Sequence, residues 1–137
     1  AMVEALKLSG IRRVSVVTPY TDSINERLTA FLEGHEFEVL SMAGQQIVPN
    51  LEIGRQTPET IAAFAKANLS PKADGLFLSC TNWRSMETAE ALEQRMGLPV
   101  ITSNQATIWA IYRTIGIRAP VAGYGKLLSS LPRASSW

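Results

Sequence analysis

The sequence has few of the residues and segments that mark several common classes of protein. Its 137 residues include a single cysteine, Cys80, and a single histidine, His35. A lone cysteine excludes a disulfide within the chain and favours a reducing, cytoplasmic setting. No apolar segment approaches the roughly 20 residues of a membrane-spanning helix, and no basic stretch with an apolar core opens the chain as in a secretory signal. We therefore expect no membrane partner and no secretory signal.

An excess of charge of one sign is missing as well. The chain carries 13 basic and 12 acidic residues, for a net charge of +1, and both signs are interspersed along it. Nucleic-acid binding relies on basic patches, so the composition gives no support for a nucleic-acid partner. No cluster of His, Asp and Glu indicates a metal site. The segment Gly123-Tyr124-Gly125-Lys126 has the wrong glycine spacing for a dinucleotide or phosphate loop, and no strand precedes it.

Short apolar segments alternate with segments of helical periodicity through residues 1–117. Strands are expected at residues 13–18, 37–42, 76–79 and 99–102. Helices are expected at residues 2–9, 21–34, 57–70, 83–96 and 104–115, with a long loop at 43–56. Apolar strands that alternate with helices are typical of a parallel sheet covered on both faces. We predict an α/β fold, a three-layer flavodoxin-like domain with a four-stranded parallel sheet in residues 1–117, followed by a C-terminal tail at 118–137.

Residues with capping side chains mark several of the expected helix starts. Ser23 with Glu26 has the spacing of a capping box. Thr57 precedes Pro58, which suits the first helical position. Asn104 is the expected cap of the last long helix.

Small polar side chains follow each predicted strand. In an open parallel sheet, ligands bind beyond the carboxyl ends of the strands. The side chains expected there carry hydroxyl, phenol, amide or thiol groups and no charge: Thr18, Tyr20, Asn50, Ser79, Cys80, Thr81, Asn82, Ser103 and Asn104. Such groups suit hydrogen bonds to a carboxylate or a carbonyl.

Cys80 is the sharpest of these features. It ends an apolar strand and precedes a predicted helix, whose amino-terminal N–H groups would favour a thiolate. The alternative is a buried, inert cysteine. No second histidine or acidic residue has a spacing that supports a catalytic triad with Cys80.

The other candidates each have a structural alternative. Tyr20 could donate from its phenol to an anionic substrate, or it could close the sheet edge as a half-buried aromatic. Asn50 lies in the long loop, where it is either a ligand or a turn residue. Ser103 and Asn104 are interpreted as helix-capping residues rather than ligands.

Several motifs, in order, resemble the second domain of enzymes in the aspartate/glutamate racemase superfamily. They are VTPYTDSINERL at residues 17–28, NLEIGR at 50–55 followed by TPE at 57–59, LSCTNWR at 78–84, PVITSNQA at 99–106 and GYGKLL at 123–128. The branch they resemble is that of maleate cis-trans isomerases and arylmalonate decarboxylases, and an ectoine-degradation branch shares these motifs. The resemblance covers essentially the whole chain.

The resemblance implies a fold of two similar domains that face each other across a cleft, each able to offer a cysteine at a strand end. Cys80 would be the second-domain thiol that transfers a proton during isomerisation, racemisation or decarboxylation of a small dicarboxylate substrate. Tyr20 and Asn50 would bind the substrate carboxylate, and the backbone N–H groups of Thr81 and Asn82 would form an oxyanion site. Such enzymes use no metal and no organic cofactor.

The chain has about half the length that the resemblance implies for such an enzyme. Residues 1–10 would be the linker helix between the domains, and residues 118–137 would return to a missing N-terminal domain, so that both segments lack their packing partner. We expect the other wall of the site to come from that domain or from a homo-oligomer partner, and the chain to be a fragment, a short gene product or part of a split assembly. Two alternatives stay open: a non-catalytic module that binds a small ligand or a partner, and a flavodoxin-like module in which Cys80 is inert.

Overall fold

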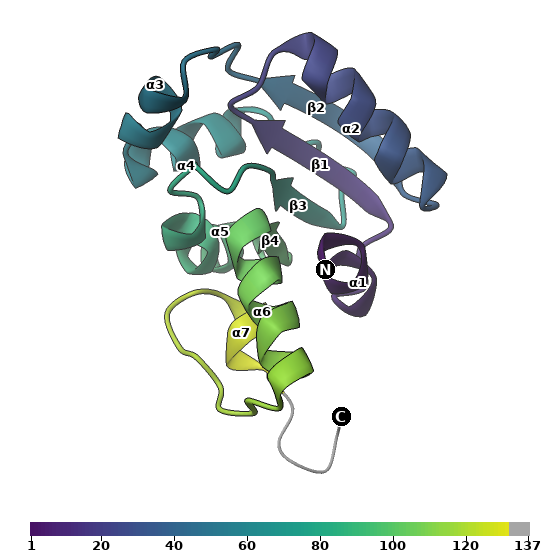
Figure 1. Ribbon diagram of the computed structural model, residues 1–137. Helices are drawn as coiled ribbons and strands as arrows, with labels where there is room; N and C mark the ends of the chain where they lie inside the picture. Colours follow the sequence, from purple (N-terminus) through teal and green to yellow (C-terminus); the bar gives the residue numbers. More distant parts are fainter. Residues whose placement is uncertain (132–137) are drawn as a thin grey trace.

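The computed structural model describes residues 1–131 and has a four-stranded parallel sheet at its centre (Figure 1). The strands are β1 (Arg13–Thr18), β2 (Glu38–Gly44), β3 (Gly75–Leu78) and β4 (Val100–Thr102). Their order is β2-β1-β3-β4, and every neighbouring pair is parallel. This is the flavodoxin-like order, so the predicted fold class is confirmed.

Helices cover both faces of the sheet. The helices are α1 (Met2–Leu8), α2 (Asp22–Gly34), α3 (Asn50–Arg55), α4 (Pro58–Ala67), α5 (Ala89–Met96), α6 (Ser103–Ile115) and α7 (Lys126–Ser129). One core cluster joins Val14, Val16 and Phe77 of the sheet to α1, α2, α6 and α7. A second joins Val17 and Leu78 to α3, α4 and α5. Alternate strand residues thus face opposite helical layers, which gives the three layers that the sequence predicts.

The first and last described helices pack on this domain. Ala5 and Leu6 of α1 are fully buried, and so is Leu128 of α7; Leu131 is 3% exposed. All belong to one core cluster with Trp109. Residues 1–10 and 118–131 therefore do have packing partners within this domain, so the expectation that they lack them is wrong. Residues 132–137 lie outside the described part of the chain.

Several predicted helix boundaries are wrong. α6 is capped by Thr102, which forms a capping box with Gln105, rather than by Asn104. α2 follows Thr21, and no side chain caps it, so the Ser23 capping box does not form. The expected helix at 83–96 begins only at Ala89, after a turn and the short 3₁₀ helix η1 (Met86–Thr88). The loop at 43–56 contains the end of β2 and helix α3, whereas the Thr57 cap before Pro58 is confirmed.

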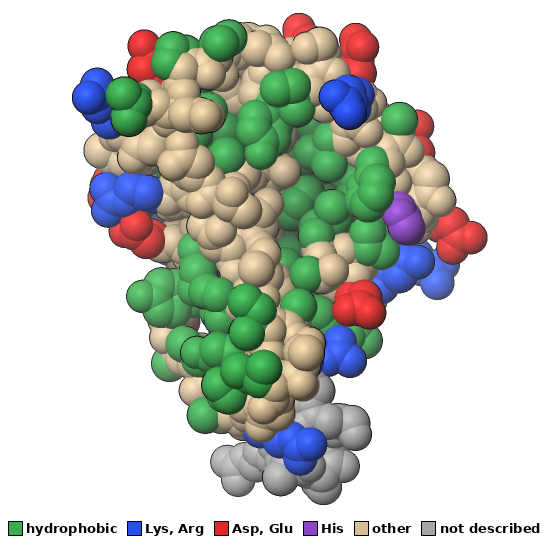
Figure 2. Space-filling model, viewed as in Figure 1, with side chains coloured by type: hydrophobic (Ala, Val, Ile, Leu, Met, Phe, Trp, Pro, Cys, Tyr) green, Lys and Arg blue, Asp and Glu red, His purple; other side chains and the backbone are tan. Residues whose placement is uncertain are grey.

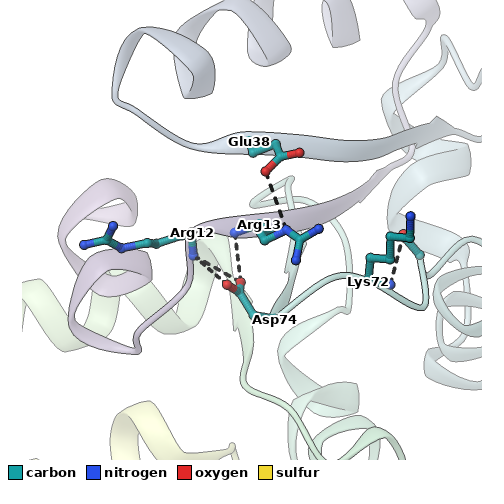
Figure 3. A network of polar contacts seen from close by, with 6 residues as sticks. Arg12, Arg13, Glu38, Lys72 and Asp74 are labelled. Atoms are coloured by element: carbon teal, nitrogen blue, oxygen red, sulfur yellow. Dashed lines mark hydrogen bonds and ion pairs between the residues drawn. The ribbon is translucent and has the colours of Figure 1, made fainter.

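Charged side chains gather where the strands begin (Figure 3). The carboxylate of Asp74, just before β3, accepts the backbone N–H groups of Arg12 and Arg13 at 2.9–3.2 Å. Arg13 also pairs with Glu38 of β2, at 3.5 Å between nitrogen and oxygen. These contacts tie the starts of three neighbouring strands together.

Apolar side chains remain exposed on the outer helices. Figure 2 shows hydrophobic side chains over the part of the visible face that α6 occupies. Ile111 and Ile115 of α6 are 49% and 63% exposed, and Phe31 of α2 is 48% exposed. No helix among residues 1–131 is both long and apolar enough to cross a membrane.

Candidate active site

The candidate site lies at the carboxyl ends of β1 and β3, which are neighbours in the sheet. The helix after β1 packs on one face of the sheet, and the helices after β3 pack on the other. Such a change of side opens a crevice where ligands bind in open α/β sheets. Val17 pairs with Leu78, so the residues that follow them leave the sheet side by side.

Tyr20 and Cys80 come together at the carboxyl ends of β1 and β3. The phenol of Tyr20 lies close enough to the side chains of Cys80 and Ser79 to interact with both. Cys80 is 6% exposed and belongs to the second core cluster, which also holds Ile53 and Trp83. A thiol and a phenol, both uncharged in their protonated forms, therefore lie together at the carboxyl ends of these strands.

The helix amino terminus beside Cys80 is not the one that the sequence predicts. Residues 81–85 form turns, so the helix after Cys80 starts too far along the chain for its N–H groups to lie beside the thiol. The neighbouring helix start is that of α6, where the Ser103 hydroxyl accepts the backbone N–H of Cys80 at 3.1 Å. Ser103 therefore contacts the backbone of the thiol-bearing residue and does not serve as the helix cap.

The turn after Cys80 is held by side-chain amides. Asn104 Nδ2 donates to the carbonyl oxygen of Thr81 at 3.0 Å. Asn82 Nδ2 donates to the carbonyl oxygen of Asn50 at 2.8 Å, which ties the turn to the first residue of α3. Among the described residues, the backbone N–H groups of Thr81 and Asn82 have no acceptor.

All five predicted site residues therefore lie at one edge of the sheet. Tyr20 and Cys80 are in contact, and Asn50, Thr81 and Asn82 are joined through the turn. Sequence reasoning missed the contacts of Ser103 and Asn104 with this turn. Their position directly after β4 could have indicated these contacts, because β4 is the neighbour of β3 in the sheet.

A groove of about 420 Å³ continues from this turn. Its lining is mostly neutral and includes aromatic, thioether and amide side chains, with one ion pair between Arg84 and Glu87. It is lined by Gly54, Thr81, Asn82, Trp83, Arg84, Met86, Glu87, Asn104 and Tyr124. No cluster of three or more His, Cys, Asp or Glu side chains that could hold a metal ion occurs within residues 1–131.

The Tyr20 phenol titrates abnormally in this setting. Burial raises the pKa of Tyr20 to about 12; the contact with Cys80 adds to this, and the hydrogen bond with Ser79 opposes it. Because the unfolded phenol ionises near 10, this group stabilises the folded state below pH 10, and that contribution is lost as the pH rises from 10 to about 12.

Tyr20→Phe should therefore remove part of the loss of stability at alkaline pH. The measurement is the free energy of unfolding of both proteins, by denaturant titration at several pH values from 9 to 12. Tyr124→Phe, at a more exposed phenol, is the matched control and should keep the wild-type pH dependence. An identical alkaline decline in wild type and Tyr20→Phe would contradict the assigned environment.

The fold and the site together define a class of protein: a flavodoxin-like α/β domain with a cysteine thiol and a tyrosine phenol across its switch point. The family model for arylmalonate decarboxylase matches residues 1–128, and the chain belongs to that family. The expected membership in the maleate isomerase and arylmalonate decarboxylase branch is thus confirmed.

Similar proteins include both activities of this branch. Arylmalonate decarboxylase of Bordetella bronchiseptica is 32% identical over 93% of this chain and 54% of its own length. Maleate isomerase of Nocardia farcinica is 30% identical over 93% of this chain and 51% of its own length. A serine-for-cysteine variant of the Nocardia farcinica maleate cis-trans isomerase, solved with a covalently bound succinylcysteine intermediate, is 28% identical with a TM-score of 0.88, over 93% of this chain and 53% of that one. The chain spans about half the length of the curated relatives it matches.

Proposed function

We propose that the chain supplies one wall of a cofactor-free, cysteine-dependent site that moves a proton at the carbon next to a carboxylate of a small dicarboxylic acid. The reaction class is that of the relatives, isomerisation or decarboxylation, with racemisation as the related chemistry. The observation that carries the proposal is the contact between the Tyr20 phenol and Cys80 at the switch-point crevice. Among the described residues, the side chains that act on the Tyr20 phenol are those of Cys80 and Ser79, and neither is a carboxylate that would repel an anionic ligand.

Each group has a role that follows from its chemistry. Cys80 supplies the thiol that gives a proton to the carbon next to the carboxylate once an electron pair stands on that carbon and its carboxylate oxygens. In a decarboxylation the departing CO2 leaves that electron pair, and in an isomerisation a nucleophile from the opposite wall adds to the double bond and creates it. In a racemisation the Cys80 thiolate itself removes the proton, and the electron pair moves onto the carboxylate oxygens. Tyr20 donates its phenolic hydrogen bond to a substrate carboxylate, and the Asn50 amide is a second donor. The unpaired N–H groups of Thr81 and Asn82 stabilise the developing negative charge. Cys80 cannot use its own N–H in this way, because that group already donates to Ser103.

The opposite wall of the site has to come from other residues. The relatives are about twice as long as the matched region, so a second domain is the first candidate, and another copy of this chain is the second. Exposed Ile111 and Ile115 on α6 provide apolar surface for either partner. Because a proton-transferring thiol has to stay reduced, we further propose that the protein acts in the cytoplasm.

Protection of the thiol tests this proposal directly. Cys80 is the only cysteine, so its alkylation by iodoacetamide can be followed by the mass of the intact chain. Maleate should slow the alkylation of Cys80, and acetate at equal ionic strength should not. Tyr20→Phe should lose most of this protection, because the phenol that binds the carboxylate is gone.

Tyr112→Phe, on α6 and outside the lining of the groove, is the matched control for this experiment and should keep the protection. An alkylation rate that maleate leaves unchanged in the wild-type chain would mean that dicarboxylates do not bind beside Cys80. That result would overturn the proposal.

A further inference from the structure

Buried polar side chains lie directly behind Tyr20. Thr18, the last residue of β1, is fully buried, and Asn25 in the first turn of α2 is 4% exposed. The Thr18 hydroxyl donates to Asn25 Oδ1 at 2.7 Å. The same hydroxyl oxygen accepts the backbone N–H of Tyr20 at 3.0 Å. A continuous chain of hydrogen bonds therefore joins Asn25 to the backbone of the phenol-bearing residue.

The single proton of the Thr18 hydroxyl fixes the direction of these hydrogen bonds. A hydroxyl has one proton, and the Thr18 oxygen can present a lone pair to Tyr20 only if that proton points elsewhere. Asn25 Oδ1 accepts it. The orientation of the Asn25 amide thus sets the orientation of the Thr18 hydroxyl, which in turn holds the backbone at Tyr20.

Residues that follow β2 also form hydrogen bonds with the turn that carries Tyr20. Gln46 donates its backbone N–H to the Tyr20 carbonyl at 3.1 Å, and Ile47 donates to the Pro19 carbonyl at 2.9 Å. A Cβ atom at Gly44 would overlap both Asn25 Nδ2 and the Tyr20 carbonyl oxygen. The absence of a side chain at Gly44 therefore lets the amide and the turn approach each other closely.

The nitrogen of the same amide is left without a partner. Asn25 Nδ2 is buried and has no hydrogen-bond partner among the described residues. An unpaired buried donor destabilises the folded state, a cost that an apolar side chain of the same shape avoids. The favourable interaction that asparagine makes at this position is the one through its oxygen, toward Thr18.

We propose that Asn25 is a positioning residue: its side-chain oxygen orients the Thr18 hydroxyl, which holds the Tyr20 backbone and so keeps the phenol beside Cys80. The inference deepens the proposed function, on which its catalytic meaning rests. Asn25 does not touch the substrate in this account, because Thr18 and the turn lie between it and the crevice.

The test is the titration of the Tyr20 phenol in the whole chain without substrate, by NMR of ring-labelled tyrosine with the Tyr20 signal assigned from Tyr20→Phe. In Asn25→Leu, which has similar volume but no acceptor, the pKa of Tyr20 should fall from about 12 toward 10. Thr18→Val should give the same fall, and it carries the test if Asn25→Leu does not fold. Thr18→Ser keeps the hydroxyl and should keep the value near 12.

A merely structural role predicts a different pattern. Ser15 is a buried residue of β1, away from Tyr20, and its hydroxyl forms hydrogen bonds with Ser41 and Ser70. Ser15→Ala removes these bonds and is the destabilised control. Its Tyr20 titration should stay near 12. A folded Thr18→Val or Asn25→Leu protein with an unshifted Tyr20 titration would overturn the inference. Because this readout needs no substrate, it is independent of whether maleate protects Cys80, so the two proposals fail separately.

Discussion

Cys80→Ser is expected to abolish proton exchange at the carbon next to the substrate carboxylate, with a loss of roughly 10²–10⁴-fold in rate. Serine has nearly the same shape as cysteine, but its hydroxyl is a far weaker acid than a thiol, so it neither forms the conjugate base nor returns the proton at neutral pH. The measurement is deuterium incorporation into the dicarboxylate in D₂O, followed by proton NMR, under conditions in which the wild-type chain shows exchange.

The control for this prediction separates chemistry from folding. Cys80→Ser should unfold at nearly the same denaturant concentration as the wild-type chain, because serine has nearly the shape of cysteine at this position of the core cluster. Alkylated wild-type chain should lose exchange as Cys80→Ser does. Exchange at the wild-type rate in Cys80→Ser would show that another group moves the proton.

Leu128→Ala and Leu6→Ala are each expected to lower the free energy of unfolding by about 2–5 kcal/mol. Both leucines are fully buried in the core cluster that also holds Trp109. Truncation removes their apolar contacts and leaves a cavity, and such a loss is a large fraction of the roughly 5–15 kcal/mol that stabilises a typical domain. Denaturant titration of each variant is the measurement.

Leu8→Ala is the matched control, because Leu8 ends the same helix as Leu6 but is 68% exposed. It should change the free energy of unfolding by no more than about 0.5 kcal/mol. If Leu128→Ala were as mild as Leu8→Ala, α7 would not be part of this core, and the tail would behave as the sequence analysis expected.

The sheet could be predicted because its signals are local. Val14 and Val16 alternate with Val17 in the apolar segment that forms β1, and these residues do contact opposite helical layers. The edge that holds the site followed from the rule for carboxyl ends of parallel strands, which places Tyr20 and Cys80 after strands of one sheet. The sequence alone does not show that these strands are neighbours or that the two side chains lie close together. Both follow from the strand order of the folded sheet.

The errors lie where distant residues decide the local structure. Residues 83–88 have a helical apolar pattern, yet Trp83 and Ser85 lie in a turn. Their side chains are buried there, at 1% and 0% exposed. Tertiary packing of these side chains outweighs helical periodicity there. The sequence analysis expects residues 118–137 to return to a missing domain, whereas Leu128 lies in one core cluster with Leu6 and Trp109, which are remote from it in sequence. The contact between Thr18 and Asn25 was hidden as well, because the spacing of two polar residues does not show that their side chains converge.

The central claim is that this chain supplies one wall of a thiol-dependent proton-transfer site, and proton NMR with maleate in D₂O tests it most directly. The chain should be measured alone and after addition of the half of the Nocardia farcinica maleate isomerase that it does not match. The account predicts little exchange by the chain alone, and fumarate or deuterium next to a carboxylate once an opposite wall is present, both dependent on Cys80. Rapid turnover by the chain alone as a monomer would contradict the half-site, and protection of Cys80 by maleate without any exchange in either case would indicate a binding module instead of an enzyme.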